Sequence, residues 1–291
     1  MTNKTVPVVP SFPDDVRAAI RAAAQLLEHV SDSARLDAEY LMAHALGVER
    51  DRLLLDPTRY QTPNDYAAFI QRRLAQEPAA YIVGYRDFWT LRLAVGPGVL
   101  IPRPDSETLI EAMLGACDDV QAPLRVLDLG TGPGTLLLAA LSELPSATGL
   151  GVDASAAALE FARRNADAAG LSRRTDFRLG DWGAGIDTQF DIILCNPPYI
   201  GDDEILQADV ADYEPRDALF AGPDGLDDYR RLIPQFDDLL ADNGMALLEI
   251  GYTQAKVVGD LAEKAGFSAR CFADLAGRDR ALMLKRIASS E

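Results

Sequence analysis

From Arg125 onwards, short apolar runs alternate with longer segments of helical periodicity. The expected strands are 126–129, 148–153, 176–179, 190–195 and 244–250, and the expected helices are 136–144, 154–169, 226–240 and 253–265. Because parallel strands need long crossover connections, this alternation predicts a mostly parallel, doubly wound α/β sheet. Two further runs, 267–272 and 280–284, are too close in sequence for a helical crossover and predict an antiparallel pair that completes seven strands.

The first part of the chain has a different pattern. Apolar residues recur at helical spacing from Pro13 to Glu77, and no strand-like run interrupts them. β-forming residues at 81–85 and 88–95 then predict a hairpin. The expected organisation is a flexible tail at 1–12, a helical domain at 13–79, a β-hairpin linker at 80–103 and the sheet domain at 104–291.

The charge balance limits the kinds of partner. The chain has 28 Lys and Arg against 45 Asp and Glu, a formal net charge of −17, whereas a nucleic-acid clamp needs a basic face. We therefore expect no direct contact with nucleic acid. No apolar run is long enough to span a bilayer, and the chain begins with no signal-like segment, so we expect a cytoplasmic protein without membrane contact.

Cysteine and histidine are too few and too scattered for a disulfide framework or a metal site. Cys117, Cys195 and Cys271 form no CxxC pair, which suits a reducing compartment. His29 and His44 lie within helical patterns and lack candidate partner ligands. We therefore expect no metal cofactor.

A glycine-rich turn joins the first strand to the first helix of the alternating region. It reads Asp128-Leu129-Gly130-Thr131-Gly132-Pro133-Gly134. The glycines permit a tight turn and close approach of a ligand to the backbone, and the following helix presents free N–H groups. The turn predicts a nucleotide-cofactor loop, with a plain tight turn between strand and helix as the alternative.

Two residues after later strands can complete a nucleotide site. Asp153 ends the second strand, where a carboxylate can accept both hydroxyls of a ribose, as in NAD or S-adenosylmethionine. Its alternative role is a helix N-cap, which Ser155 also suits. Trp182, next to Asp181 after the third strand, can stack on an adenine, and its alternative is packing under a loop.

The fourth strand ends in a rigid polar turn, Asn196-Pro197-Pro198-Tyr199. Ligands of open α/β sheets bind at the carboxyl ends of the strands, and consecutive prolines fix the backbone there. The turn resembles the Asn/Asp-Pro-Pro-Tyr signature of class I S-adenosylmethionine-dependent methyltransferases that act on planar nitrogen. This resemblance implies that the Asn196 carboxamide oxygen and the Pro197 carbonyl accept both N–H groups of such a nitrogen, while Tyr199 stacks on its π-system. Such a nitrogen is a poor nucleophile, so orientation and electrostatics would carry the catalysis, with no His or Cys base.

Over nearly the whole chain, the sequence resembles the peptide chain release factor glutamine methyltransferases, the PrmC/HemK type of protein-glutamine N5-methyltransferase. The segments that carry this wider resemblance are 35–39, 77–84, 88–107, 213–219 and 222–226.

The resemblance implies a Rossmann-like class I methyltransferase fold. It implies methyl transfer from S-adenosyl-L-methionine, leaving S-adenosyl-L-homocysteine, to the side-chain amide nitrogen of the glutamine in the Gly-Gly-Gln motif of release factors, which modulates translation termination. The implied cofactor residues are Gly130, Thr131, Gly132, Pro133, Gly134, Asp153, Trp182 and Asn196. The implied substrate residues are Asn196, Pro197, Pro198 and Tyr199, of which Asn196, Pro197 and Tyr199 are catalytic. The helical domain would help to grip the release factor, and we expect a monomer.

Some features depart from the family or leave a role open. Pro133 stands where the family usually has a small polar residue, and its missing N–H removes one potential contact to the cofactor carboxylate. The helix after it is richer in leucine than is usual in the family, and 277–280 follow the family pattern only loosely. Arg103 and Glu107 in the linker either border the active site or form an ion pair that pins the domains.

Other functions stay open at this point. A related enzyme would methylate a glutamine of a ribosomal protein. An adenine-N6 methyltransferase of nucleic acid shares the logic of the Asn196 turn, but it needs a basic target-recognition region. A non-catalytic regulator would bind the cofactor without transferring its methyl group, and it would not need the complete set of Gly130 to Gly134, Asp153 and Asn196.

Overall fold

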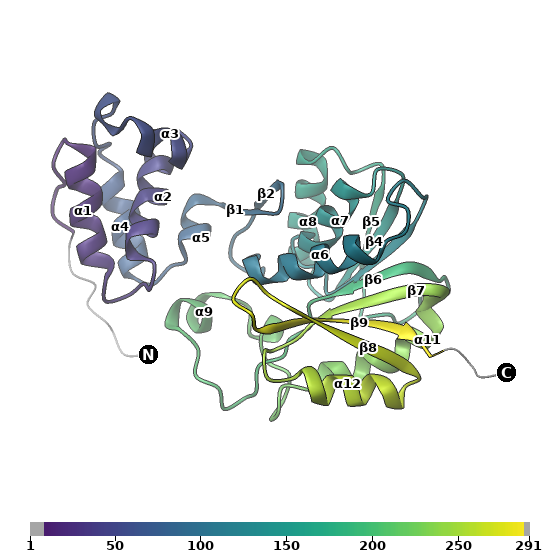
Figure 1. Cartoon of the computed structure of the whole chain (residues 1–291). Coiled ribbons are helices and arrows are strands. Elements are labelled where there is room, and N and C mark those ends of the chain that lie inside the picture. The colour runs from purple at the N-terminus through teal and green to yellow at the C-terminus, as the bar shows by residue number, and fades with distance from the viewer. Residues whose placement is uncertain (1–8, 288–291) are drawn as a thin grey trace. The chain divides into compact units, whose positions relative to one another are not determined.

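A computed structural model describes residues 9–287 of the chain, which divide into two units (Figure 1). The first unit runs to Tyr85 and also includes Leu206–Tyr213. The second comprises Arg86–Ile205 and the chain from Glu214 onwards. They are termed here the helical unit and the sheet unit. Most of the tail expected at 1–12 lies outside the described residues.

The helical unit is built of helices, as the sequence predicts for residues 13–77, and it also contains a helix from later in the chain. Its elements are α1 (Val16–Leu27), α2 (Ala34–Leu46), α3 (Arg50–Leu55), η1 (Pro57–Arg59), α4 (Tyr66–Leu74), α5 (Ala79–Val83) and α9 (Ala208–Tyr213). Helix α1 buries Val16, Ile20 and Leu27 on one face, the spacing that predicted it. Its first turn is capped by the Asp15 side chain, which accepts from the Ala18 N–H at 2.8 Å.

The hairpin is shorter than the sequence predicts. The strand expected at 81–85 is wrong for its first residues, which form α5 instead. Pro78 precedes this helix and Gly84 ends it at a φ of 82°. The observed hairpin pairs β1 (Tyr85–Phe88) with β2 (Leu91–Ala94). Burial of the apolar α5 side chains overrides their β-propensity.

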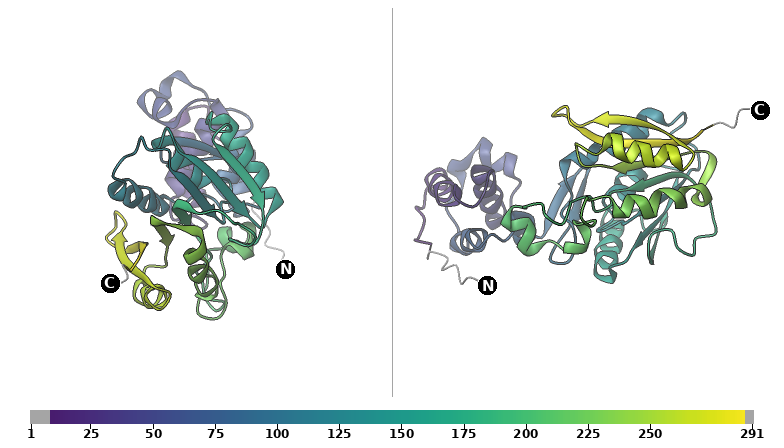
Figure 2. Two further views of the ribbon diagram at one scale, coloured as in Figure 1. Left: turned by 90° about the vertical axis from the view of Figure 1, so that its right-hand side faces the viewer. Right: turned by 90° about the horizontal axis from the view of Figure 1, so that it is seen from below.

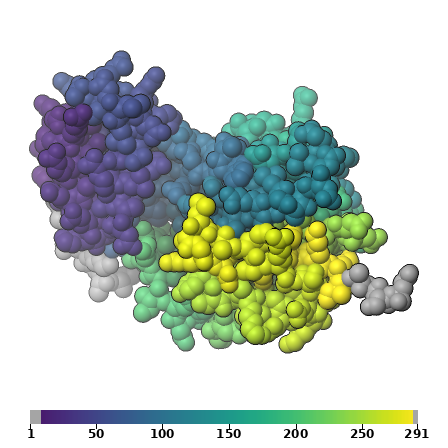
Figure 3. Space-filling view, in the orientation of Figure 1, coloured from purple at the N-terminus to yellow at the C-terminus, as the bar shows by residue number. Residues whose placement is uncertain are grey.

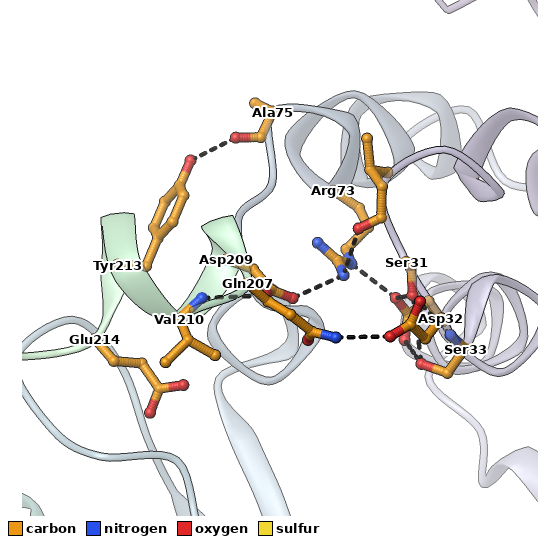
Figure 4. A network of polar contacts seen from close by, with 12 residues as sticks. Ser31, Asp32, Ser33, Arg73, Ala75, Gln207, Asp209, Val210, Tyr213 and Glu214 are labelled. Carbon is orange, nitrogen blue, oxygen red and sulfur yellow. Dashed lines mark hydrogen bonds and ion pairs between the residues drawn. The ribbon is translucent and has the colours of Figure 1, made fainter. Parts of the chain in front are cut away.

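A buried arginine holds α9 to the helical unit (Figure 4). Arg73 in α4 is 3% exposed, and its guanidinium bonds Asp37 of α2 at 2.7 Å and Asp209 of α9 at 3.0 Å. The Tyr213 hydroxyl, at the other end of α9, donates to the Ala75 carbonyl at 2.9 Å. Residues 208–213, which lie between the expected strand at 190–195 and the expected helix at 226–240, are therefore part of the helical unit.

The sheet unit contains the predicted seven-stranded, mostly parallel sheet (Figure 1). Its strands are β3 (Arg125–Leu129), β4 (Thr148–Asp153), β5 (Thr175–Leu179), β6 (Phe190–Cys195), β7 (Leu240–Glu249), β8 (Phe267–Ala273) and β9 (Asp279–Arg286). Their order is β5-β4-β3-β6-β7-β9-β8, in which β9 is antiparallel to both neighbours. The predicted fold class and C-terminal antiparallel pair are confirmed.

Helices cover both faces of this sheet (Figures 1 and 2). One face carries α6 (Glu107–Ala116), α7 (Thr135–Glu143) and α8 (Ala156–Ala168), and the other carries α10 (Asp227–Leu232), η4 (Ile233–Gln235), α11 (Phe236–Leu239) and α12 (Ala255–Lys264). Strand β6 serves both cores, because Ile192 and Leu194 pack in one and Ile193 and Cys195 in the other. This two-sided burial explains its continuous apolar run.

The helices are short, and one is shorter than the sequence predicts. The continuous helix expected at 226–240 is interrupted by η4, where Pro234 lacks the N–H that an α-helical turn needs. Strand β7 then begins at Leu240, earlier than expected. Within residues 9–287, no helix combines the length and the apolar character that crossing a membrane requires.

One edge of the sheet is open. The C-terminal strands lie at the surface in Figure 3, where they are yellow, and β8 is one of the two edge strands, with β5 at the opposite edge. Ser268, Arg270 and Cys271 on β8 are exposed. Polar and charged side chains on an edge strand disfavour pairing with another chain.

The order of the strands places the ligand site. Strand β3 is paired with β4 on one side and β6 on the other, so the chain reverses direction across the sheet at β3. Loops that leave β3 and β6 therefore diverge to opposite faces and open a crevice between them at the carboxyl ends of the strands. The glycine-rich turn and the Asn196 turn leave these two strands.

Arg73→Met should destabilise the helical unit selectively. It leaves a carboxylate buried without its cation, a change that costs about 3 kcal/mol. Trp89 and Trp182 both lie in the sheet unit, so tryptophan fluorescence reports that unit alone. In denaturant titrations, we expect the far-ultraviolet circular dichroism of the variant to change at lower denaturant than in the wild type, with the fluorescence transition unmoved.

Arg35→Met is the matched control. Arg35 is 57% exposed in its ion pair with Glu39, which keeps a second partner in Arg50, so the loss should stay below about 1 kcal/mol. Equal effects of the two substitutions would contradict a stabilising role for the buried arginine.

Candidate functional site

A cavity of about 420 Å³ lies in the sheet unit at the carboxyl ends of β3 to β6. Its walls come from the linker, the glycine-rich turn and the segments that follow β4, β5 and β6. Of the residues predicted to form the site, it is lined by Gly130, Thr131, Gly132, Pro133, Asp153, Trp182, Asn196 and Pro198. Gly134, Pro197 and Tyr199 lie next to lining residues in sequence but do not themselves line it.

The glycine-rich turn needs its glycines. Gly130, Gly132 and Gly134 have φ values of 72°, 55° and 87°, a region that side chains disfavour. A Cβ on Gly130 would approach the Trp182 ring to 3.1 Å, and one on Gly134 would approach Leu138 to 2.9 Å. No atom lies within 4 Å of a Cβ built on Gly132, so a ligand can come close to the backbone there.

Asp128, at the end of β3, supplies a buried acceptor that the sequence analysis did not assign. One carboxylate oxygen accepts from the Thr131 hydroxyl at 2.6 Å and from the Leu137 N–H at 3.2 Å. The other oxygen, Oδ1, is buried without a hydrogen-bond partner among the described residues. Burial raises the pKa of Asp128 to about 7. Because Asp128 lines the cavity, Oδ1 can accept from a cationic donor of a ligand.

Asp153 is not the residue that caps helix α8. Ser155 caps α8 by accepting from the Ala158 N–H at 3.2 Å. The Asp153 carboxylate instead accepts from the Gly132 N–H and the Ser155 N–H, both at 2.8 Å. Each of its oxygens keeps a lone pair for a further donor, such as a hydroxyl. Asp153 therefore joins the glycine-rich turn to the end of β4 and still offers acceptors to the cavity.

Trp182 both packs and lines the cavity. Its backbone has a φ of 50°, unusual for a bulky residue, and its ring lies against Gly130. The indole also packs against the core that contains α10 to α12. Asp181 is engaged elsewhere, because Arg231 donates to its carboxylate at 2.8 Å. The two interpretations of Trp182, packing and ligand contact, are therefore compatible.

The Asn196 turn is held by a buried polar network. The Asn196 amide nitrogen donates to the Ser106 hydroxyl at 3.3 Å, and Ser106 in turn donates to the Glu249 carboxylate. The Tyr199 hydroxyl donates to the other Glu249 oxygen at 3.3 Å. Burial raises the pKa of Tyr199, so this hydroxyl stays protonated as a donor. Ser106 and Glu249 were not predicted from the sequence.

The linker residues left open above have different roles. Arg103 lines the cavity and donates to Glu214 at 2.5 Å, and the other Glu214 oxygen accepts from the Ile101 N–H at 3.0 Å. Glu107 instead accepts from the Trp89 N–H at 2.8 Å, which fixes the hairpin turn. Arg103 thus borders the cavity, and its ion-pair partner is Glu214.

Pro133 is accommodated by an asparagine that the sequence did not reveal. Asn165 of α8 is 2% exposed and donates to the Pro133 carbonyl at 2.8 Å. The same side chain bonds both the N–H and the carbonyl of Ala94 in β2, at 2.7 and 3.1 Å. The glycine-rich turn is therefore fixed to the hairpin through its proline carbonyl.

The arrangement combines a cofactor-type cavity with a rigid amide at its edge. Acceptors of the kind that hold ammonium and hydroxyl groups lie at Asp128 and Asp153, beside the aromatic ring of Trp182. The Asn196 amide nitrogen is used within the protein, so the carboxamide oxygen is the atom left to accept from a ligand. This geometry suits the orientation of an N–H group against a bound cofactor.

Known protein families match both units. Residues 18–84 match the model of the PrmC N-terminal domain, and residues 121–273 match a model of a methyltransferase domain. The release factor glutamine methyltransferase of Rhodospirillum rubrum is 43% identical over 261 residues, which cover 88% of this chain and 80% of that protein. The protein of the same name from Caulobacter vibrioides is 39% identical over 278 residues, covering 92% and 95%.

A third relative extends the agreement. The release factor glutamine methyltransferase of Cereibacter sphaeroides is 41% identical over 269 residues, which cover 90% of this chain and 95% of that protein. The family predicted from the Asn196 turn and the linker is confirmed. The chain belongs to the release factor glutamine methyltransferase family.

Proposed function

We propose that this chain transfers a methyl group from S-adenosyl-L-methionine to the side-chain amide nitrogen of the glutamine in the Gly-Gly-Gln motif of a peptide chain release factor. The observation that carries the proposal is the orientation of Asn196. Its amide nitrogen bonds Ser106, which leaves the carboxamide oxygen as the acceptor that Asn196 offers to a ligand in the cavity that it lines. An acceptor oxygen there suits the N–H of a planar amide.

The residues of the cavity fit S-adenosylmethionine. The unpartnered Oδ1 of Asp128 suits the ammonium of its methionine part, and the acceptors of Asp153 suit the ribose hydroxyls. Trp182 offers an aromatic face for the adenine, and Gly132 lets the ligand approach the backbone. When bound, the cofactor supplies a methyl group activated by its sulfonium sulfur.

The Asn196 turn orients the acceptor. Asn196 Oδ1 and the Pro197 carbonyl accept the two N–H groups of the glutamine amide, while the Tyr199 ring supports its plane. The stiff prolines set the angle between these groups before the substrate arrives, so little orientational entropy is lost in the reaction. Asn196, Pro197 and Tyr199 are thus the proposed catalytic residues, with Pro198 as part of the substrate site.

The helical unit is the proposed grip on the release factor. Arg73 fixes α9 to it, and α9 lies in the stretch of chain between the Asn196 turn and Glu214, the partner of Arg103. Helix α9, which belongs to the proposed recognition unit, is therefore close in sequence to the Asn196 turn. The proposed enzyme acts in the cytoplasm as a monomer.

Methyl transfer from labelled S-adenosylmethionine tests the proposal. The acceptors are a release factor, the same factor with its Gly-Gly-Gln glutamine replaced by alanine, a ribosomal protein and DNA. We expect label on the intact release factor alone. Label on DNA alone would contradict the proposal, and label on the ribosomal protein alone would favour the related enzyme.

Asn196→Ala should abolish most turnover. Loss of one preorganised hydrogen bond to the acceptor costs about 100-fold or more in kcat, because it acts where the reaction needs orientation. Cofactor affinity, measured by calorimetry, should change little. Near-normal kcat at saturating cofactor would refute the assigned role of Asn196.

Asp153→Ala should weaken cofactor binding by about 1–3 kcal/mol, since the ribose hydroxyls lose the half-buried carboxylate that would accept from them. Ser155→Ala is the matched control at a neighbouring cavity residue, because it removes the side-chain cap of α8, at a cost of about 1 kcal/mol of stability, and keeps both the Asp153 carboxylate and the backbone N–H that donates to it. Calorimetry should separate the two. If Asp153→Ala binds the cofactor as tightly as Ser155→Ala does, Asp153 has a structural role only.

A further inference from the structure

Glu249 is a buried carboxylate that the mechanism above does not use. It ends β7, and the pairing of Cys195 with Leu248 places it beside the first residue after β6, which is Asn196. The side chain is 1% exposed. One of its oxygens accepts from Ser106, which is bonded to Asn196 at the start of the Asn196 turn, and the other accepts from Tyr199 at the end of that turn.

The hydrogen bonds in this network have one permitted direction. An ionised carboxylate can only accept, so Ser106 must give its single proton to Glu249. The Ser106 oxygen then has only lone pairs to offer, and Asn196 must present its amide nitrogen. The Asn196 oxygen is consequently directed away from Ser106, as an acceptor.

Protonation of Glu249 removes this constraint. A neutral carboxyl group can donate to the Ser106 oxygen, and the Ser106 proton can then bond the Asn196 oxygen. The amide is free to turn over, and its nitrogen, which cannot accept, would face the substrate. The same change weakens the acceptor for the Tyr199 hydroxyl.

We propose that Glu249 is a positioning residue that, through Ser106, fixes the Asn196 amide with its oxygen toward the substrate nitrogen and also holds Tyr199. The inference rests on the proposed function, because that function requires the Asn196 oxygen to accept from the substrate nitrogen. It adds a control of amide orientation by a residue that does not itself reach the substrate.

The charges around Glu249 set the pH range of this effect. The charged and titratable groups that face it from neighbouring elements are Arg280 on β9, Asp105 in η2 (Pro104–Ser106), Tyr199, Tyr229 on α10 and Cys195 on β6. Burial raises the pKa of Glu249 to about 6, while the Ser106 hydrogen bond and Arg280 oppose the rise. Glu249 is therefore mostly ionised at neutral pH and becomes protonated in mild acid.

The test is the pH dependence of kcat at saturating S-adenosylmethionine, a condition that offsets weaker cofactor binding when Asp128 is protonated. The acceptor is whichever protein in the labelling panel takes the methyl group. Wild-type kcat should fall about tenfold between about pH 7 and about pH 5, with an apparent pKa near 6. A flat profile would overturn the inference, whereas absence of any labelled acceptor would instead refute the proposed function.

Three variants separate positioning from structural support. Glu249→Gln should lower kcat roughly 10- to 100-fold, with unchanged cofactor affinity by calorimetry. It should also lose the acidic limb of the pH profile, which is the fall in kcat between about pH 7 and about pH 5. Ser106→Ala should also lower kcat, and Ser106→Thr, which keeps the hydroxyl, should restore it. Persistence of the acidic limb in Glu249→Gln, or wild-type kcat in Ser106→Ala, would overturn the assignment.

Tyr229→Phe is the control for a general disturbance. The Tyr229 hydroxyl donates at 2.8 Å to the backbone carbonyl of Glu249, not to its carboxylate. The substitution removes a buried hydrogen bond from the same residue and leaves the Ser106 connection intact. We expect it to keep the acidic limb; its loss in this variant would mean that the limb reports local packing and would count against the inference.

Discussion

A buried carboxylate needs hydrogen-bond donors around it, and this requirement determines how the Asn196 turn is held. Glu249 meets it with Ser106 and Tyr199, so two residues distant in sequence are fixed around one charge. Asp128 meets it only in part: one oxygen is bonded within the glycine-rich turn and the other is left for a ligand. The bonds to Glu249 make the Asn196 turn rigid. The free oxygen of Asp128 leaves the cofactor cavity with an acceptor for a cation.

The topology brings these carboxylates to one place. Strands β3, β6 and β7 are consecutive in the sheet and parallel. Asp128, the Asn196 turn and Glu249 therefore lie together at the carboxyl ends of these strands. The fold thus supplies a cofactor cavity and an oriented amide. In the proposed reaction these address the main barrier, which is the poor nucleophilicity of a planar nitrogen, and the nitrogen gives up one proton to water as it takes the methyl group.

Sequence reasoning recovered the features that are local in the chain. The glycine-rich turn, Asp153 and the Asn196 turn each carry their signal within a few residues of a strand end. Ser106 and Glu249 are 143 residues apart, so no local pattern could pair them. Asn165 was hidden in a regular helix, and the helix α5 was misread because burial outweighs the β-propensity of its apolar residues. The position of α9 likewise depends on Arg73, a long-range contact.

In the proposed reaction, the Asn196 oxygen faces the acceptor nitrogen because the Asn196 amide nitrogen is held by Ser106. The most direct measurement is a crystal structure of the chain with S-adenosylhomocysteine and the Gly-Gly-Gln segment of a release factor. We expect the glutamine amide nitrogen to lie within hydrogen-bond distance of Asn196 Oδ1 and the Pro197 carbonyl, with the Ser106 contact retained. A glutamine amide bound away from Asn196, or an Asn196 side chain turned away from Ser106, would contradict it.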